Sequence, residues 1–308
     1  MKKQALVVGS VAMDILFPIE GDLRKEIPLN NGKLKKVNMS FLARKSQYYY
    51  GGTSANIAYG LALLGHKPIM FSAVGKDFED DYKSHLEKVG VICKPIIGPK
   101  DSETAKCFQI SDSIYQQITI FQANFYGDRI DDMSLTETIS KEKLRKIDIA
   151  IFSPGNNLST LNNTQELRRL NKNATIIFDP GMNVTSFSKE DLTECASLSD
   201  ILISNDVEIL RISKVHSLEI KDLLDIGLDY VIETKGEKGS TIHSLKGTRN
   251  IPIVKPKKVI ETTGAGDAYR SGLISGLLND KSLKDSCKLG ATVSSKCVES
   301  YGGQNYKI

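Results

Sequence analysis

Val259-Ile260-Glu261-Thr262-Thr263-Gly264-Ala265-Gly266-Asp267-Ala268 is the stretch that decides how the rest of the chain is interpreted. A β-branched run ends in two threonines and a Gly-Ala-Gly turn, and apolar residues at helical spacing follow. This pattern predicts a strand over 259–262, a tight turn and then a helix. The glycines leave the backbone uncovered, so the amides of residues 264 to 267 can converge on an anion at the positive end of the helix.

Asp267 lies at the start of the expected helix, where a carboxylate could act as a general base beside a bound phosphate. An anion site that contains a carboxylate suggests phosphoryl transfer. A structural interpretation is also open, in which the segment is only a glycine-rich turn with Asp267 as N-cap. Two other nucleotide motifs are excluded, because there is no G-x-x-x-x-G-K-[ST] segment and Tyr269 stands where a dinucleotide motif needs glycine.

The composition is that of an ordinary globular protein of 308 residues, with 40% hydrophobic and 25% charged residues. Net charge is only +4 and the basic residues are spread along the chain, so we expect no nucleic-acid partner. No apolar run approaches the ~20 residues of a membrane span. The five cysteines are scattered and form no C-x-x-C pair, which favours a cytoplasmic protein without disulfides or structural zinc.

Alternating strands and helices dominate the second half of the chain. Apolar β-branched runs are separated by helical stretches such as 164–170, and a last helical stretch covers 283–298. This alternation predicts an α/β fold with a mostly parallel sheet flanked by helices, whose ligands bind at the carboxyl ends of the strands. The expected strands of this sheet are 4–9, 69–74, 147–152, 175–179, 200–204, 229–233 and 259–262.

Two segments, 17–50 and 94–126, lack the helical period of the rest of the chain. Each contains strand candidates separated by turn residues, and the second one reads as a hairpin around 111–113. Two such segments in one α/β chain could build a single small β-sheet lid. The candidate strands are 36–41, 47–50, 103–110 and 115–121, and the remaining segments 1–16, 51–93 and 127–308 form the expected core.

A glycine pair precedes the first long helix. Gly51 and Gly52 would allow close backbone approach by a polyhydroxylated ligand, and Asn56 could donate to a hydroxyl group, although a plain helix start with Thr53 or Ser54 as cap is equally open. Earlier in the chain, Asp14 follows the first strand and could accept hydrogen bonds from two neighbouring hydroxyls, or simply be a turn residue.

Two further strand ends carry candidate ligands for a nucleotide and its metal ion. Asn205 and Glu208, three residues apart, could hold a hydrated Mg²⁺ or could form a helix capping box. Thr234, Gly236 and Gly239 could contact nucleotide phosphates through a hydroxyl and backbone amides, or could form a hairpin turn. Asp179-Pro180-Gly181, at another strand end, is most simply a turn.

Taken together, these segments resemble the ribokinase-family (PfkB-type) carbohydrate kinases over essentially the whole chain. The two family motifs correspond to 51–58 and 261–267, and the N-x-x-E and G-x-x-G elements to 205–208 and 236–239. The resemblance implies a Rossmann-like, ribokinase-like core with a β-sheet lid. It also implies ATP as phosphate donor, Mg²⁺, Asp267 as the base and an anion hole made by the amides of Gly264, Ala265 and Gly266.

By the same resemblance, Asp14, Gly52 and Asn56 would bind sugar hydroxyls. Glu261 stands where the family usually has aspartate, near a place where relatives often bind a monovalent cation, and this leaves activation by K⁺ open. The segments 36–41, 267–272 and 301–306 are most similar to the adenosine and nucleoside kinase branch.

The resemblance therefore implies phosphorylation of the primary hydroxyl of a nucleoside, with adenosine favoured. A ribose- or fructose-type sugar kinase and a non-catalytic nucleotide or sugar sensor remain as alternatives. Either a monomer or a homodimer is compatible with the sequence.

Overall fold

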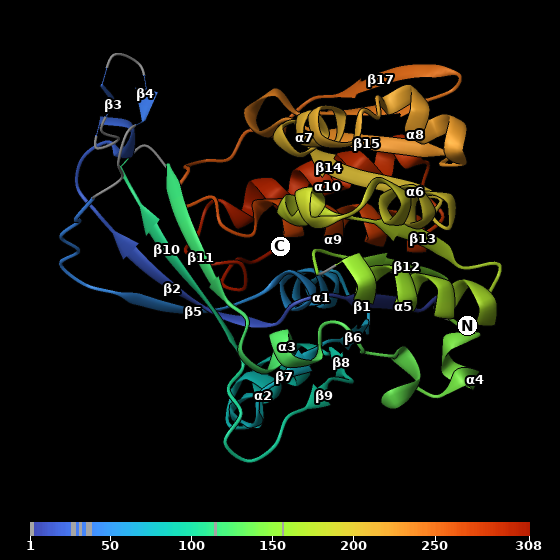
Figure 1. Ribbon diagram of the computed structural model, residues 1–308, viewed down its shortest axis with the longest axis horizontal. Helices are drawn as coiled ribbons and strands as arrows, with labels where there is room; N and C mark the ends of the chain where they lie inside the picture. Colours follow the sequence, from blue (N-terminus) through green and yellow to red (C-terminus); the bar gives the residue numbers. More distant parts are fainter. Residues whose placement is uncertain (1–2, 26–28, 31–32, 35–38, 114–115, 156) are drawn as a thin grey trace.

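The computed structural model describes residues 3–25, 29–30, 33–34, 39–113, 116–155 and 157–308. In this part of the chain the main sheet has nine strands, and its inner strands pair in parallel (Figure 1). In spatial order the strands are β17 (Gly247–Ile251), β16 (Ser240–Ser244), β15 (Tyr230–Thr234), β14 (Ile201–Asn205), β13 (Thr175–Phe178), β12 (Ile149–Phe152), β1 (Ala5–Val8), β6 (Ile69–Phe71) and β8 (Ile92–Cys93).

Alternate strand residues point to opposite sides of this sheet, so both faces carry apolar side chains. Helices cover both of these faces. Ile149 and Ile151 of β12 pack in one apolar cluster, whereas Ala150 and Phe152 pack in another. The first cluster includes residues of α1 (Thr53–Leu63), α2 (Tyr82–Val89), α9 (Ala265–Leu278) and α10 (Leu283–Cys297). The opposite face carries α5 (Asn157–Leu170), α6 (Lys189–Ser197), α7 (Asp206–His216) and α8 (Ile220–Ile226). The expected mostly parallel α/β sheet with flanking helices is confirmed.

A second, four-stranded sheet extends from the core to the left in Figure 1. Its spatial order is β11 (Gln117–Gln122), β10 (Ala105–Ser111), β2 (Ala12–Pro18) and β5 (Gln47–Gly51). The predicted hairpin is confirmed by the antiparallel pairing of β10 with β11. The sequence patterns do not predict β2, because they place residues 12–16 in the core. The interpretation of Asp14 as a simple turn residue is wrong, since Asp14 lies inside this strand and pairs with Tyr49 and Cys107.

Three of the predicted strands differ from the structure. The predicted strand 69–74 is divided into β6 and β7 (Ala73–Val74), and β7 pairs with β9 (Ile96–Ile97) in a separate two-stranded sheet. The prediction of a strand over 259–262 is wrong, because Ile260 donates its N–H to Val298 O at 2.8 Å, at the end of α10, instead of to a neighbouring strand. Of the candidate strand 36–41, residues 36–38 lie outside the described part and residues 39–41 are not in a strand. Conversely, the sequence patterns do not predict β16 and β17, which extend the sheet with antiparallel pairs.

The shorter elements complete the fold. No helix in the described ranges is both long enough and apolar enough to cross a membrane. The remaining elements are β3 (Leu29–Asn30), β4 (Lys33–Leu34), β7 (Ala73–Val74), β9 (Ile96–Ile97), α3 (Asn124–Arg129), α4 (Lys141–Leu144) and the 3₁₀ turns η1 (Leu23–Lys25), η2 (Lys76–Glu79), η3 (Leu135–Glu137), η4 (Gly181–Ser186) and η5 (Gly236–Lys238).

Candidate active site

The glycine-rich turn before α9 is shaped by Gly264, which is the N-cap residue of the helix and has a φ of 77°. A Cβ at this position would lie 2.6 Å from Gly303 Cα, so only glycine fits there. The N–H groups in the first turn of an α-helix have no partner inside the helix. In α9 one of these groups, Ala265 N, donates to Thr262 O in the preceding turn at 3.2 Å. Asp267 is not the N-cap, so that structural alternative is wrong.

The half-buried Asp267 side chain meets α1 at this point. Asn56 Nδ2 donates to Asp267 Oδ2 at 2.9 Å. Burial raises the pKa of Asp267 to about 6, while the hydrogen bond from Asn56 and the charge of Arg270 act in the opposite direction. A carboxylate with this pKa is mostly ionised at neutral pH and still accepts a proton readily, as a general base requires.

Asp14 lies beside the two glycines that precede α1. A Cβ at Gly51 would lie 2.2 Å from Asp14 Cγ, so the glycine leaves the space that the carboxyl group occupies. Gly52 has a φ of 88° and is the N-cap of α1, so neither Thr53 nor Ser54 caps this helix. Burial, together with the charges of Asp267 and Glu261, raises the pKa of Asp14 to about 8. Of the predicted substrate residues, Asn56 therefore contacts Asp267, and Asp14 lies near enough to feel its charge.

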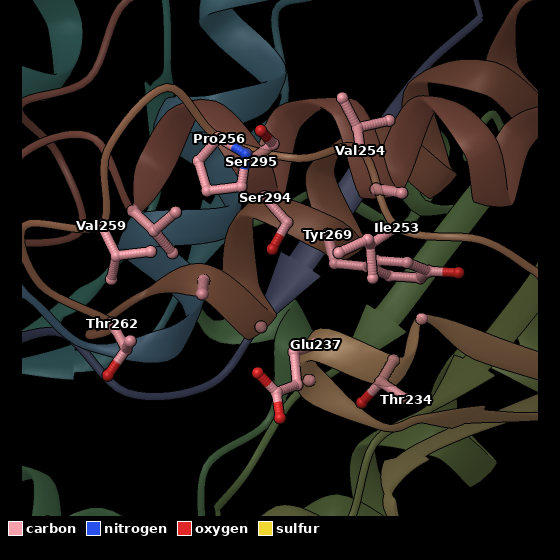
Figure 2. Close-up of a pocket in the computed structure, with 16 residues that line it drawn as sticks. Thr234, Glu237, Ile253, Val254, Pro256, Val259, Thr262, Tyr269, Ser294 and Ser295 are labelled. Carbon is pink, nitrogen blue, oxygen red and sulfur yellow. The ribbon is translucent and has the colours of Figure 1, made fainter. Parts of the chain in front are cut away.

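A cavity of about 470 Å³ lies on the other side of the glycine-rich turn. Ala265 and Gly266 line it together with Thr234, Gly236 and Gly239 from the turn between β15 and β16. Figure 2 shows Thr234 and Glu237 across the cavity from Pro256 and Ser295. The hairpin interpretation of 234–239 is confirmed, and the same turn also lines the pocket. The other lining residues are mainly apolar and include Ile253, Val254, Val259, Tyr269, Ala291 and Val298.

Asn205 and Glu208 form the capping box that the structural alternative anticipated. Asn205 Oδ1 accepts from Glu208 N at 2.8 Å, and Glu208 Oε2 accepts from Asn205 N at 2.8 Å. Within the described ranges there is no group of three or more His, Cys, Asp or Glu side chains that could hold a metal ion. Glu208 Oε1 has no hydrogen-bond partner among the same residues, which fits a hydrated ion held mainly by phosphate oxygens and waters.

Sequence reasoning missed a buried ion pair beneath the site. Arg270 Nε and Nη2 donate to Asp179 Oδ2 and Oδ1 at 2.5 and 2.8 Å, and Arg270 Nη1 donates to Gly266 O at 3.1 Å. Asp179, interpreted only as a turn residue, therefore binds the helix that carries Asp267. Burial raises the pKa of Glu208, and the nearby charge of Asp179 adds to this effect.

Two further contacts tie the turn to its surroundings. Glu261 Oε1 accepts from Thr263 N at 2.5 Å and Glu261 Oε2 accepts from Gly302 N at 3.2 Å, so this carboxylate joins the turn to the C-terminal segment. Thr263 Oγ1 donates to Gln109 Oε1 at 3.1 Å, which joins the turn to β10 of the four-stranded sheet. Gln109 carries no sequence signal of this role, and the segment 301–306 is distinguished in the sequence only by its similarity to the adenosine and nucleoside kinase branch.

These features define the class of the protein, which is a kinase: a phosphotransferase with an alcohol group as acceptor. Its sequence matches the pfkB family of carbohydrate kinases over residues 3–307, and the chain belongs to that family.

Similar proteins fit this assignment. A nucleoside kinase of Methanocaldococcus jannaschii is 31% identical over 301 residues, which cover 96% of this chain and 91% of the relative. A nucleoside kinase of Burkholderia thailandensis in complex with inosine superposes with a TM-score of 0.85 at 26% identity, covering 98% of this chain and 93% of the other. The ADP-inosine complex of the same kinase gives a TM-score of 0.84 at 26% identity, covering 99% and 92%.

Proposed function

We propose that this kinase transfers the γ-phosphoryl group of ATP to the primary 5′ hydroxyl of a nucleoside, with adenosine as the favoured acceptor. One observation carries the proposal: Asp267 is hydrogen-bonded to Asn56 beside Asp14, at the start of α9, whose Ala265 and Gly266 also line the 470 Å³ cavity. The inosine complex of the Burkholderia thailandensis kinase and the name of the Methanocaldococcus jannaschii relative support a nucleoside acceptor.

On the acceptor side, the ribose lies against Gly51 and Gly52, where the absence of side chains allows close approach. The Asp14 carboxylate accepts hydrogen bonds from two neighbouring ribose hydroxyls, and Asn56 offers its remaining N–H. Asp267 takes the proton of the 5′ hydroxyl as the phosphoryl group arrives. Because phosphoryl transfer depends mainly on positioning and charge stabilisation, these fixed contacts account for most of the catalysis.

On the donor side, the apolar cavity holds the nucleotide, and Thr234, Gly236 and Gly239 lie along its phosphates. The amides of the N-cap residue Gly264 and of Ala265 and Gly266 in the first turn of α9 stabilise the charge on the transferred group. The ADP-inosine complex of the Burkholderia thailandensis kinase supports ATP as donor. Glu208 and Asn205 would hold Mg²⁺ through water, and the ion would neutralise phosphate charge when bound. Glu261 adds a negative charge where a monovalent cation could bind.

A panel of acceptors tests the proposal. Purified protein is incubated with ATP and Mg²⁺ and with adenosine, inosine, cytidine, ribose or fructose, and the phosphorylated products are quantified. Adenosine should be phosphorylated with a kcat/KM well above that of the free sugars, because the sugars cannot use contacts to a base. A sugar that exceeds every nucleoside would overturn the assignment in favour of a sugar kinase. ATP and inosine binding with no product would indicate a sensor.

We also place the protein in the cytoplasm, because its cysteines are unpaired: Cys93 and Cys107 are half-buried and Cys195, Cys287 and Cys297 are buried. An adenosine kinase there would serve purine salvage.

A further inference from the structure

The C-terminal segment after α10 returns to the centre of the molecule, between α1 and the four-stranded sheet (Figure 1). Gln304 in this segment is 2% exposed, which is unusual for a glutamine. The preceding Gly303 packs so closely that a Cβ there would lie 2.7 Å from Asn56 Cγ. A buried amide at this place must make hydrogen bonds, and its partners are residues of the candidate site.

The direction of these hydrogen bonds is fixed by Tyr82 on α2. Tyr82 Oη lies 2.5 Å from Gly51 O, and because a carbonyl can only accept, the single hydroxyl hydrogen must point there. Tyr82 Oη can then only accept from Gln304, whose Nε2 lies 2.7 Å away. The same Nε2 group donates to Asn56 Oδ1 at 2.9 Å.

The orientation of Gln304 in turn fixes that of Asn56. Since Asn56 Oδ1 accepts from Gln304, its Nδ2 group faces Asp267 and donates to Oδ2 at 2.9 Å. A flipped Asn56 amide would place its carbonyl oxygen against the Asp267 carboxylate, and two acceptors would then repel each other. Gln304 and Asp267 therefore favour the same orientation of Asn56, and Gln304 supplies the donor that holds the Asn56 oxygen in place.

His85 supports the opposite end of Gln304. His85 Nε2 lies 3.1 Å from Gln304 Oε1, so the ring donates from Nε2. The imidazole stacks on Tyr50 and Tyr59 with ring centroids 4.4 and 5.5 Å apart, which leaves it little freedom to turn. Burial lowers the pKa of His85 below its ordinary value, which favours the neutral ring with one N–H for this bond.

We propose that Gln304, held by Tyr82 and His85, is a positioning residue that sets the orientation of Asn56 and thereby keeps Asp267 ready to accept the proton of the substrate hydroxyl. This inference rests on the proposed function, in which Asp267 is the general base. The chain of contacts crosses from the C-terminal segment to α1 and then to α9. The alternative is that Gln304 only anchors the C-terminus.

The pH dependence of turnover separates these two roles. Loss of the Asn56 hydrogen bond removes a contact that favours the ionised carboxylate, so the pKa of Asp267 rises and the acidic limb of the kcat profile moves to higher pH. An anchor that affected only stability would lower Tm without moving this limb. The titratable and charged groups that act on or lie beside Asp267 are Asp14 on β2, Asp179 after β13, Glu208 on α7, Arg270 on α9, Cys297 on α10 and Tyr306 in the C-terminal segment.

The experiment is a double-mutant cycle in the full-length protein. Q304L removes the amide with little change in volume, N56A removes its target, and the double variant combines them. N305D is the control, because Asn305 is exposed and its side chain donates to Tyr301 O instead of to a residue of the candidate site. We expect Q304L to lower kcat roughly 10–100-fold, the scale of one hydrogen bond to a charged group. The acidic limb should rise by roughly one pH unit, and N305D should behave as wild type.

The cycle also shows whether Gln304 acts through Asn56. The double variant should be no slower than N56A alone, because Gln304 has nothing left to orient. Multiplicative losses in the double variant, or a Q304L protein with lower Tm but unchanged kcat and unchanged acidic limb, would overturn the inference.

A second readout does not depend on turnover. Carbon-13 NMR titration of the Asp267 carboxyl, assigned with D267N, should give a higher pKa in Q304L than in wild type. An equal pKa in both proteins would refute the positioning role. Failure of the proposed function would look different, because wild-type protein would phosphorylate no nucleoside while the titration still showed the shift.

Discussion

Asp14 and Asp267 are two carboxyl groups of one site, and they behave differently. Asp14 comes from the four-stranded sheet and burial raises its pKa to about 8, whereas Asp267 comes from α9 and its pKa is about 6. Asp267 has a hydrogen bond from Asn56 and the charge of Arg270 to favour ionisation. Asp14 has no hydrogen-bond donor among the described residues, and the charges of Asp267 and Glu261 further oppose its ionisation.

The comparison teaches that burial raises the pKa of both groups and that neighbouring donors and charges then separate the two roles. At neutral pH Asp267 is mostly ionised and ready to take a proton, while Asp14 stays mostly protonated until ligand hydroxyls arrive to satisfy its oxygens. A substrate that donates to Asp14 would favour its ionised form. Before the nucleoside binds, Asp267 thus already has a donor that favours its ionised form, whereas Asp14 still lacks one among the described residues.

The largest expected effect comes from removing the base. D267N keeps the shape of the side chain but cannot accept the proton, so kcat should fall by a factor on the order of 10²–10⁴. Nucleoside affinity, measured by calorimetry without ATP, should change little. D225N is a matched control because Asp225 is exposed on α8. A D267N protein with near-normal kcat would remove Asp267 from the mechanism.

Removing the other carboxylate should produce the opposite pattern. D14N loses charge-assisted hydrogen bonds to the ribose, so KM for the nucleoside should rise roughly 10–100-fold, while kcat at saturation falls much less. Initial-rate kinetics over a wide nucleoside range give both constants. If kcat fell as far as in D267N with KM unchanged, the two carboxylates would have to exchange roles.

The same variant has a consequence for stability that sharpens the comparison. The pKa of Asp14 is about 8 in the folded protein, against an ordinary value of 3.8 for an exposed aspartate, so between these pH values the folded form holds a proton that the unfolded form has lost. Stability from this group therefore falls as pH rises from about 4 to 8. D14N removes this loss, so its Tm relative to wild type should increase between pH 5 and pH 9 in calorimetric scans. A constant difference would contradict the raised pKa.

Local sequence patterns predicted the parts of the molecule that local forces determine. The inner parallel strands, the hairpin of β10 and β11 and the glycine-rich turn before α9 all follow from periodicity and turn residues near each other in the chain. The expected strand at 259–262 failed because tertiary contact with Val298 outweighs the β-propensity of its side chains.

The contacts that organise the site could not be predicted, because they join distant positions. Asn56 meets Asp267 across 211 residues and Gln304 across 248, while Arg270 meets Asp179 across 91. No periodicity links residues so far apart, and a single sequence does not show which polar groups will share a buried space. The residue types at 14, 56 and 267 suggested chemistry, but the different pKa values of Asp14 and Asp267 depend on neighbours that only the fold supplies.

The smallest expected effect concerns the contact that joins the two regions. Gln109 in β10 accepts from Thr263 Oγ1 at 3.1 Å, so the sheet that carries Asp14 is bonded to the turn before Asp267. Q109L breaks this neutral hydrogen bond and leaves both carboxylates in place. A bond of this kind contributes about 1 kcal/mol, which corresponds to roughly a fivefold loss in kcat/KM for the nucleoside.

The rate of ATP hydrolysis without acceptor distinguishes a loosened four-stranded sheet from damage to either carboxylate. If the bond holds the sheet over the site, Q109L should also hydrolyse ATP faster in the absence of acceptor, because water reaches the phosphate more easily. Coupled ATPase assays with and without adenosine measure this ratio, and Q122L serves as control because Gln122 is exposed on β11. T263V should reproduce the loss, and the Q109L/T263V double variant should add nothing, since each substitution removes the same bond. Independent losses would mean that the two residues act separately and that the sheet is held by other contacts.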